Sequence, residues 1–160
     1  GSAAVLLTND VWARMNDLEI ESYISNFEIS AVDYIDEEGL LMAPAYAVSE
    51  MLKKADLELQ DFDFYEIHEA FAAQTLATIG AWESEEFCRT KLGRNKAMGS
   101  FDQKKLNIKG GSLAIGHPFA ATGARVVATM SKLLREKGNG RGLISICTAG
   151  GMGVTAIMER

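Results

Sequence analysis

The alternation of apolar and polar positions along the chain predicts strands and helices in turn. Two-residue alternation or a short apolar run indicates a strand, whereas apolar residues three or four positions apart indicate a helix. Asn9 or Asp10 caps the first helix, and the lapses in the alternation of 23–34 fit a bulged strand. The predicted strands are residues 3–8, 23–34, 62–67, 142–148 and 154–159. The predicted helices are residues 10–18, 44–55, 70–79, 83–92 and 121–138.

The residues between and at the ends of these elements support the same reading. Pro44 suits the first turn of a helix, and helix 83–92 begins with acidic and ends with basic residues, as the helix dipole favours. Residues 36–39 form an acidic turn, and residues 93–105 an irregular loop. We expect the strand at 3–8 to be buried. The order of elements predicts an α/β fold with a mixed sheet covered by helices.

Composition limits the kind of protein further. The chain has 160 residues, enough to bury one core, and 48% hydrophobic with 24% charged residues is typical of a globular protein. No apolar run is long enough to cross a bilayer. The net charge of −6 argues against a nucleic-acid partner. The two cysteines lack the spacing of metal ligands, so a reducing compartment is the default expectation.

The glycine-rich segment 110–125, GGSLAIGHPFAATGAR, is the strongest candidate for a functional site. Its glycines allow a close approach of the backbone, and Pro118 fixes the backbone directly after His117. The only other histidine, His68, follows the predicted strand 62–67, and Cys147 ends another. Histidine and cysteine can transfer protons, and the chain has only two of each. Their place beside small residues favours an active site over a core histidine with its hydrogen bonds satisfied or a buried apolar cysteine.

Three motifs in this order resemble the C-terminal half of a thiolase. The family reads Asn-Glu-Ala-Phe-Ala, then Gly-Gly-x-x-x-x-Gly-His-Pro-x-Gly-x-[Ser/Thr]-Gly, then Cys-x-Gly-Gly-Gly. The corresponding segments here are HEAFA at 68–72, the segment 110–123, and CTAGG at 147–151. The opening GSAAVLL resembles the end of the family's first half. The resemblance therefore implies a thiolase C-terminal domain over 1–160, with the tail of the N-terminal half at 1–20 and an insert at 81–106.

The resemblance also implies roles for individual residues. His117 activates a nucleophilic cysteine on the missing half and donates to a thioester oxygen, while Cys147 moves a proton to and from the substrate α-carbon. His68 stands where the family has an asparagine of an oxyanion hole. The backbone of Ala149 and Gly150 supplies a second such hole, provided that Ala149 keeps a negative φ. Substrate contacts are expected from Gly116, Phe119 and Gly151.

Several alternatives remain open from the residues alone. Glu69 either orients His68 and backbone amides or caps the helix that follows it. The glycines could cradle a phosphate, although the lysine of a P-loop is missing. His68, His117 and Cys147 could bind zinc by residue type, but their spacing matches no ligand pattern. We therefore expect no metal and no cofactor, with coenzyme A as a co-substrate, and we expect Cys88 to be a buried structural residue.

The resemblance implies an acyltransferase, closest to the trifunctional-complex β-subunit type of 3-ketoacyl-CoA thiolase in fatty-acid β-oxidation. The chain alone is expected to be inactive. Alternatives are an acetyl-CoA C-acetyltransferase working in the biosynthetic direction and a non-catalytic module that binds CoA or lipid. Expected partners are acyl-CoA and CoA, a second copy in a homo-oligomer, and a β-oxidation complex, but no nucleic acid. The expected location is the cytoplasm, or the mitochondrion in a eukaryote.

The insert at 81–106 is expected to be peripheral, and mobile or bound to a partner. Four basic residues lie near three aromatic residues there, which suits a membrane surface or a docking element. A solvated excursion is the simpler alternative. The basic residues are Arg94, Lys96, Lys104 and Lys105, and the aromatic residues are Trp82, Phe87 and Phe101.

Overall fold

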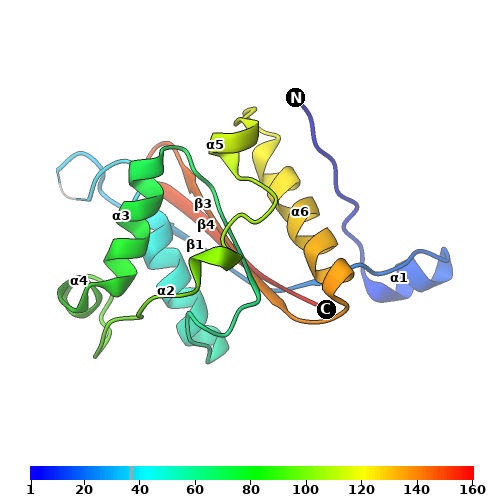
Figure 1. Cartoon of the computed structure of the whole chain (residues 1–160), viewed down its shortest axis with the longest axis horizontal. Helices are drawn as coiled ribbons and strands as arrows, with labels where there is room; N and C mark the ends of the chain where they lie inside the picture. The colour runs from blue at the N-terminus through cyan, green and yellow to red at the C-terminus, as the bar shows by residue number, and fades with distance from the viewer. Residues whose placement is uncertain (37) are drawn as a thin grey trace.

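A computed structural model, which describes residues 1–36 and 38–160, shows a four-stranded mixed sheet between helices (Figure 1). The strand order is β1-β4-β3-β2. The strands are β1 (Tyr23–Ala31), β2 (Phe64–Ile67), β3 (Arg141–Thr148) and β4 (Met152–Glu159). Strand β4 pairs antiparallel with both β1 and β3, whereas β2 pairs parallel with β3. The predicted α/β fold with a mixed sheet is confirmed.

Helices cover the two faces of the sheet unequally. Helices α2 (Ala43–Ala55) and α3 (Ala72–Glu83) pack on one face, and α6 (Thr122–Lys137) packs on the other (Figure 1). Alternate residues of β3 serve the two cores, since Leu143 lies in the cluster under α2 and α3 and Ile144 in the cluster under α6. Burial of these two apolar clusters is the main force that holds the layers together.

The remaining helices are short and are set by local caps. They are α1 (Asp10–Met15), α4 (Glu85–Thr90), α5 (Ser112–Ile115) and the 3-10 helix η1 (Gln103–Lys105). Asn9 caps α1 as predicted, because its side chain accepts a hydrogen bond from the Trp12 amide at 2.8 Å. Ser84 ends α3 and caps α4, so the boundary between the two helices lies at residue 84, close to the predicted start of the second helix at residue 83. Helix α5 was not among the predicted elements.

The lapses in the pattern of 23–34 mark a real irregularity. The register between β1 and β4 shifts between Ile24 and Asn26, which confirms the predicted bulge. The strand ends at Ala31, three residues earlier than the pattern predicts. The predicted acidic turn at 36–39 contains residue 37, which lies outside the described residues.

The prediction of a buried strand at 3–8 is wrong. These residues are exposed and belong to no strand of the described sheet, and Val5, Leu6 and Leu7 present their side chains to solvent. A strand needs a neighbour that takes up its backbone hydrogen bonds. No described strand offers one to this segment, so its apolar pattern alone does not make it a strand here.

The expectation that residues 81–106 are peripheral is also wrong. The side chains of Trp82, Cys88, Met98 and Phe101 are buried in the core under α2 and α3. The Phe101 ring stacks on Tyr65 of β2, with ring centroids 3.9 Å apart. The apolar residues of this segment therefore complete the core and are not available to a membrane surface.

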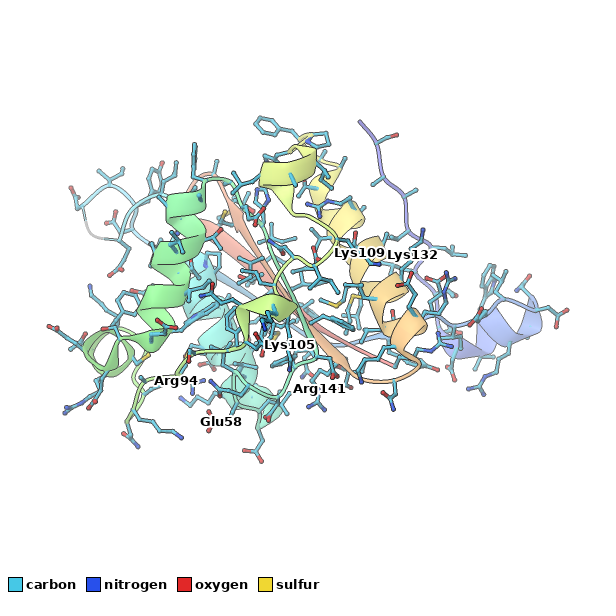
Figure 2. The ribbon with its side chains drawn as sticks, viewed as in Figure 1. Glu58, Arg94, Lys105, Lys109, Lys132 and Arg141 are labelled. Carbon is cyan, nitrogen blue, oxygen red and sulfur yellow. The ribbon has the colours of Figure 1, made fainter. Side chains whose placement is uncertain are left out.

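Two of its four basic residues are bound inside the domain. The Arg94 guanidinium donates to the Ser49 hydroxyl and carbonyl, both at 2.8 Å, and Lys105 donates to the Phe62 carbonyl at 2.8 Å (Figure 2). The other two, both lysines, are exposed. A basic surface next to exposed aromatic rings, on which the membrane hypothesis depends, is thus reduced to a pair of lysines.

Strand β4 approaches α2 so closely that one position tolerates only glycine. A Cβ at Gly153 would lie 2.6 Å from the Pro44 nitrogen and 2.8 Å from the Ala43 carbonyl carbon. Because both atoms belong to the backbone, Gly153→Ala should lower the free energy of unfolding by about 2–3 kcal/mol. Denaturant unfolding of the intact protein measures this. The control is Gly80→Ala on α3, where a Cβ meets nothing within 4 Å and stability should not fall. Equal effects of the two changes would contradict the close approach.

Candidate functional site

The parallel pairing of β2 with β3 brings two predicted site residues to one edge of the sheet. His68 directly follows β2, and Cys147 lies next to the last residue of β3. The His68 amide donates to the Ser145 carbonyl at 2.8 Å, which continues the ladder one step past β2. Carboxyl ends of neighbouring parallel strands in an α/β sheet are a usual place for a functional site.

His117 reaches the same edge from the loop between α5 and α6. Gly116 takes a φ of 94° at the end of α5, a left-handed conformation that favours glycine. The loop brings the His117 ring to within 4.2 Å of the His68 ring, measured between centroids. The Phe119 ring lies 4.9 Å from the His117 ring, measured between centroids, and is 85% exposed. Two histidines and an accessible aromatic ring thus meet at one place.

Cys147 joins this group through a small cavity that it lines together with His68. The cavity offers about 10 Å³ to the centre of a water molecule, which is about the room that one water needs. Thr75 and Ser145 also line it, and their hydroxyl groups are buried without a hydrogen-bond partner among the described residues. His68 therefore lies beside His117 and shares a cavity with Cys147, although His117 does not line that cavity. Their catalytic roles remain predictions.

The glycine turn after Cys147 is tied to the loop that follows β1. Gly150 and Gly151 have φ values of 91° and 74°, and the Gly151 carbonyl accepts from the Val32 amide at 2.8 Å. A Cβ at Gly151 would lie 2.6 Å from the Val32 carbonyl oxygen, so no larger residue fits. Ala149 is not among the described residues with positive φ. Its amide keeps the ordinary backbone geometry that the predicted oxyanion hole requires.

A hydroxyl group lies at Nδ1 of His117. The His117 Nδ1 lies 2.7 Å from Thr122 Oγ1, and the Thr122 hydroxyl donates to the Pro118 carbonyl at 3.3 Å. A hydroxyl has a single proton, so Thr122 then accepts from His117, and Nδ1 carries the ring proton. The Nε2 atom of neutral His117 is left bare, as a base requires.

His68 has a different environment, because it is only 3% exposed. Burial lowers the pKa of His68 to about 4, and the neighbouring His117 ring and the charge of Arg125 act in the same direction. His68 is therefore neutral near pH 7. Its Nδ1 lies 2.8 Å from the Ser112 hydroxyl on α5.

Burial raises the pKa of two acidic groups in this part of the fold, Cys147 and Glu66. Desolvation raises the pKa of the Cys147 thiol, and hydrogen bonds from its own backbone and from that of Ala70 offset this only in part. Desolvation also raises the pKa of Glu66 in β2 to about 7, against the pull of the Arg125 charge. Burial thus favours the neutral forms of His68, Glu66 and Cys147 more than water would.

Glu69 acts on the glycine-rich segment and not on the helix that follows it. Its Oε2 accepts from the Leu113 amide at 3.1 Å, in the first turn of α5. A Cβ at Gly111 would lie 2.2 Å from that same oxygen, which explains why glycine occupies this position. The Asn107 side chain donates to the Ile67 carbonyl and accepts from the Ile67 amide, both at 2.9 Å, and so holds the end of β2.

One position in the loop is strained. Ala120 has a φ of 66°, where the thiolase pattern has a glycine. A left-handed conformation costs an alanine roughly 1 kcal/mol. The loop therefore holds a less favourable backbone three residues after His117.

Sequence analysis missed four residues that shape this site: Glu66, Ser112, Thr122 and Arg125. The [Ser/Thr] of the thiolase pattern was a signal for Thr122. Within residues 1–36 and 38–160, no three His, Cys, Asp or Glu side chains form a group that could hold a metal ion. No helix in that part of the chain is both long and apolar enough to cross a membrane.

Replacing His68 should change how stability depends on pH. Its pKa is about 4 in the folded protein and 6.5 ordinarily, so between these values the unfolded chain binds the extra proton. The wild-type protein therefore loses unfolding free energy, roughly 3 kcal/mol, as the pH falls from about 6.5 to about 4. His68→Asn should remove this loss.

Denaturant unfolding of both proteins at about pH 7.5 and about pH 4.5 measures the difference. Glu66, whose raised pKa makes stability fall as the pH rises through about 7, is present in both proteins, so its effect cancels to first order. Parallel pH profiles for the two proteins would show that His68 is not held neutral.

Comparison with known proteins finds thiolases. The family model described as "Thiolase, C-terminal domain" matches residues 18–160. A 3-ketoacyl-CoA thiolase of Aeromonas salmonicida is 47% identical over 159 residues, and one of Shewanella sediminis is 45% identical over the same length. Each alignment covers 99% of this chain and 36% of the relative. The chain thus spans about a third of the length of these relatives.

Solved structures give the same result. Human mitochondrial 3-ketoacyl-CoA thiolase superposes with a TM-score of 0.72 and 30% identity. The Bacillus anthracis acetyl-CoA acetyltransferase superposes with a TM-score of 0.73 and 30% identity. Each match covers 94% of this chain and 33% of the other. With a family model that spans residues 18–160, the chain belongs to the thiolase family and corresponds to its C-terminal domain.

Proposed function

We propose that this chain is the C-terminal catalytic domain of a 3-ketoacyl-CoA thiolase, which transfers acyl groups between an enzyme cysteine and CoA in fatty-acid β-oxidation. The observation that carries the proposal is the His68–His117 contact of 4.2 Å, at the edge of the sheet where Cys147 also lies. The names of the relatives, at 47% and 45% identity, support the same reaction.

The nucleophilic cysteine belongs to the rest of the protein. Cys88 cannot serve, because it is buried in the core and its thiol lies within hydrogen-bond distance of the Ala81 and Trp82 carbonyls. In the proposed mechanism, the bare Nε2 of His117 removes the proton of that cysteine. The same Nε2, now protonated, is a hydrogen-bond donor for the thioester oxygen.

Cys147 is the proposed second acid–base. It takes a proton from C2 of acetyl-CoA when the carbon–carbon bond forms, and returns a proton when the bond breaks. Its raised pKa requires that the bound substrate supply hydrogen-bond donors before the thiolate forms. The backbone amides of Ala149 and Gly150 are the proposed donors to the enolate oxygen, and one such donor is worth roughly 3–4 kcal/mol in a transition state.

Acyl-CoA and CoA are the proposed substrates, with no further cofactor. The exposed Phe119 ring beside His117 offers an apolar contact for an acyl chain. Gly116, where a Cβ would meet nothing within 4 Å, gives room for the thioester close to the backbone. At Gly151 the proposed contact is with the backbone, because Val32 and Tyr34 fill the space that a side chain would need. A bacterial cell would hold the enzyme in the cytoplasm, and a eukaryotic one in the mitochondrion.

An apolar sheet face supports association with the rest of the protein or with a second copy. Phe27 and Ile29 of β1 are 74% and 66% exposed, and Met152 and Val154 of β4 lie beside them on the face that α6 leaves open. Monomeric proteins seldom leave such a face uncovered. A homo-oligomer, and docking in a β-oxidation complex, are part of the proposal.

Synthesis of acetoacetyl-CoA is the second candidate. The likeness to the Bacillus anthracis acetyl-CoA acetyltransferase supports it, and the reversible bond chemistry would use the same residues. A non-catalytic CoA or lipid binder would have no need of His117 and Cys147 at one site. Rates of the intact protein with short and long 3-ketoacyl-CoA substrates distinguish the two enzymes, and absence of turnover with either contradicts both.

His117→Ala in the intact protein should lower kcat by about 10³-fold, because it removes both the base and the thioester donor. Steady-state assays of thiolytic cleavage measure this. A matched control is Phe119→Leu, which keeps an apolar contact and should affect KM more than kcat. If His117→Ala retains near-normal kcat, His117 is not the base.

Cys147→Ala should separate the two half-reactions. Acylation of the nucleophilic cysteine needs His117 and should persist, whereas formation and cleavage of the carbon–carbon bond should stop. Mass spectrometry of the trapped acyl-enzyme and the overall rate report the two steps. Cys88→Ala is the control, because that thiol is buried in the core cluster and does not line the cavity beside His68. Near-normal overall turnover of Cys147→Ala would remove the proposed role of this residue.

A further inference from the structure

The Ser112 hydroxyl lies between His68, a candidate catalytic residue, and the charged side chain of Arg125. Ser112 is the first residue of α5 and is buried. Its Oγ lies 2.8 Å from His68 Nδ1 and accepts from Arg125 Nη2 at 3.3 Å. Three segments meet at this oxygen: the end of β2, the start of α5 and the first turns of α6.

The protons at this oxygen can be counted. Arg125 is always protonated and can only donate, so Ser112 accepts from it. The serine hydroxyl has one proton, and among the described residues the other partner of this oxygen is His68 Nδ1. That proton is therefore donated to Nδ1. The reverse arrangement, with Nδ1 donating to Ser112, leaves a buried hydroxyl proton without an acceptor, which is unfavourable.

Arg125 is held in place by a buried carboxyl group. Glu66, 1% exposed, lies in β2 with Oε2 3.6 Å from Arg125 Nη1. Glu66 Oε1 and Arg125 Nη1 have no hydrogen-bond partner in the described part of the chain. The attraction within this pair is therefore mainly electrostatic, and the Ser112 hydroxyl is the side-chain acceptor that fixes the direction of the guanidinium.

We propose that Ser112, held by Arg125, is a positioning residue that fixes neutral His68 in the tautomer with its proton on Nε2. His68 then presents an N–H group, as the amide of the family's asparagine does at this position. Nε2 of His68 has no hydrogen-bond partner among the described residues and is available to a substrate oxygen. The inference rests on the proposed thiolase function only for the identity of that oxygen.

His117 shows why the second partner of the hydroxyl matters. There the Thr122 hydroxyl donates to a carbonyl, so it accepts from Nδ1 and leaves Nε2 bare. At His68 the serine accepts from an arginine, so it donates to Nδ1 and leaves the proton on Nε2. Two neighbouring imidazoles, with centroids 4.2 Å apart and planes tilted by 49°, are thus assigned opposite roles, one as a base and the other as a hydrogen-bond donor.

The direct test is the tautomer of His68 in the intact protein. Selective ¹⁵N labelling of histidine distinguishes protonated from bare ring nitrogens, and the His68→Asn variant identifies the His68 signals. At neutral pH we expect a protonated Nε2 and a bare Nδ1. A protonated Nδ1, or a fully charged ring, would overturn the proposal. This readout does not depend on turnover, so it stands even if the proposed reaction is wrong.

Variants of Ser112 test its part in this arrangement. Ser112→Ala removes the donor to Nδ1, so the His68 signals should show a mixture of tautomers, and kcat should fall about tenfold with little change in KM. Ser112→Thr keeps a hydroxyl and should restore both the single tautomer and most of kcat. Arg125→Met removes the donor that orients Ser112 and should also give a mixture.

The outcomes separate positioning from a merely structural role. If Ser112→Ala unfolds, the Arg125→Met and Ser112→Thr spectra still decide the question. A single Nε2–H tautomer in Ser112→Ala or in Arg125→Met would overturn the role of the residue replaced. A wild-type enzyme that lacks thiolase activity but shows the expected tautomer would contradict the proposed function and leave the positioning intact.

Discussion

The parallel pairing of β2 with β3 is the constraint on which the rest of the site depends. It places His68 and Cys147 at the same edge, although almost eighty positions separate them in the chain. The pairing is short, only four residues of β2, and is reinforced beyond its end by the His68 amide and by the Asn107 side chain. The glycine-rich segment then docks on Glu69, and its loop adds His117.

Much of this arrangement could be predicted from the sequence. Periodicity located the four strands and the long helices, because each buries a regular stripe in one of two large cores. The motifs located His68, His117 and Cys147, because small residues around scarce reactive groups are a local signal. The segment 3–8 misled for a physical reason, since an apolar run specifies a strand only where a neighbouring strand accepts its hydrogen bonds.

The missed features depend on contacts between distant parts of the chain. A serine at the start of a four-residue helix and an arginine inside a long helix have no distinctive pattern of their own. Only the fold shows that Ser112 and Arg125 meet behind His68. The same holds for residues 81–106, whose aromatic residues look like a surface element in sequence but fill the core beside Tyr65.

The polar groups behind the histidines are costly for the fold and useful for the chemistry. Burial raises the pKa of Glu66 to about 7 and lowers that of His68 to about 4, so each is held away from the charge it would carry in water. Their effects on stability have opposite pH dependence between about pH 4.5 and 6.5 and partly cancel. The result is a neutral His68 imidazole whose proton is fixed. Apolar burial in the two cores on either side of the sheet offsets the free-energy cost of burying these polar groups. Chemistry that needs one imidazole as a base and its neighbour as a donor therefore depends on the Thr122 and Ser112 hydroxyl groups. The second partner of each hydroxyl, the Pro118 carbonyl or the Arg125 guanidinium, decides whether it accepts from the ring or donates to it.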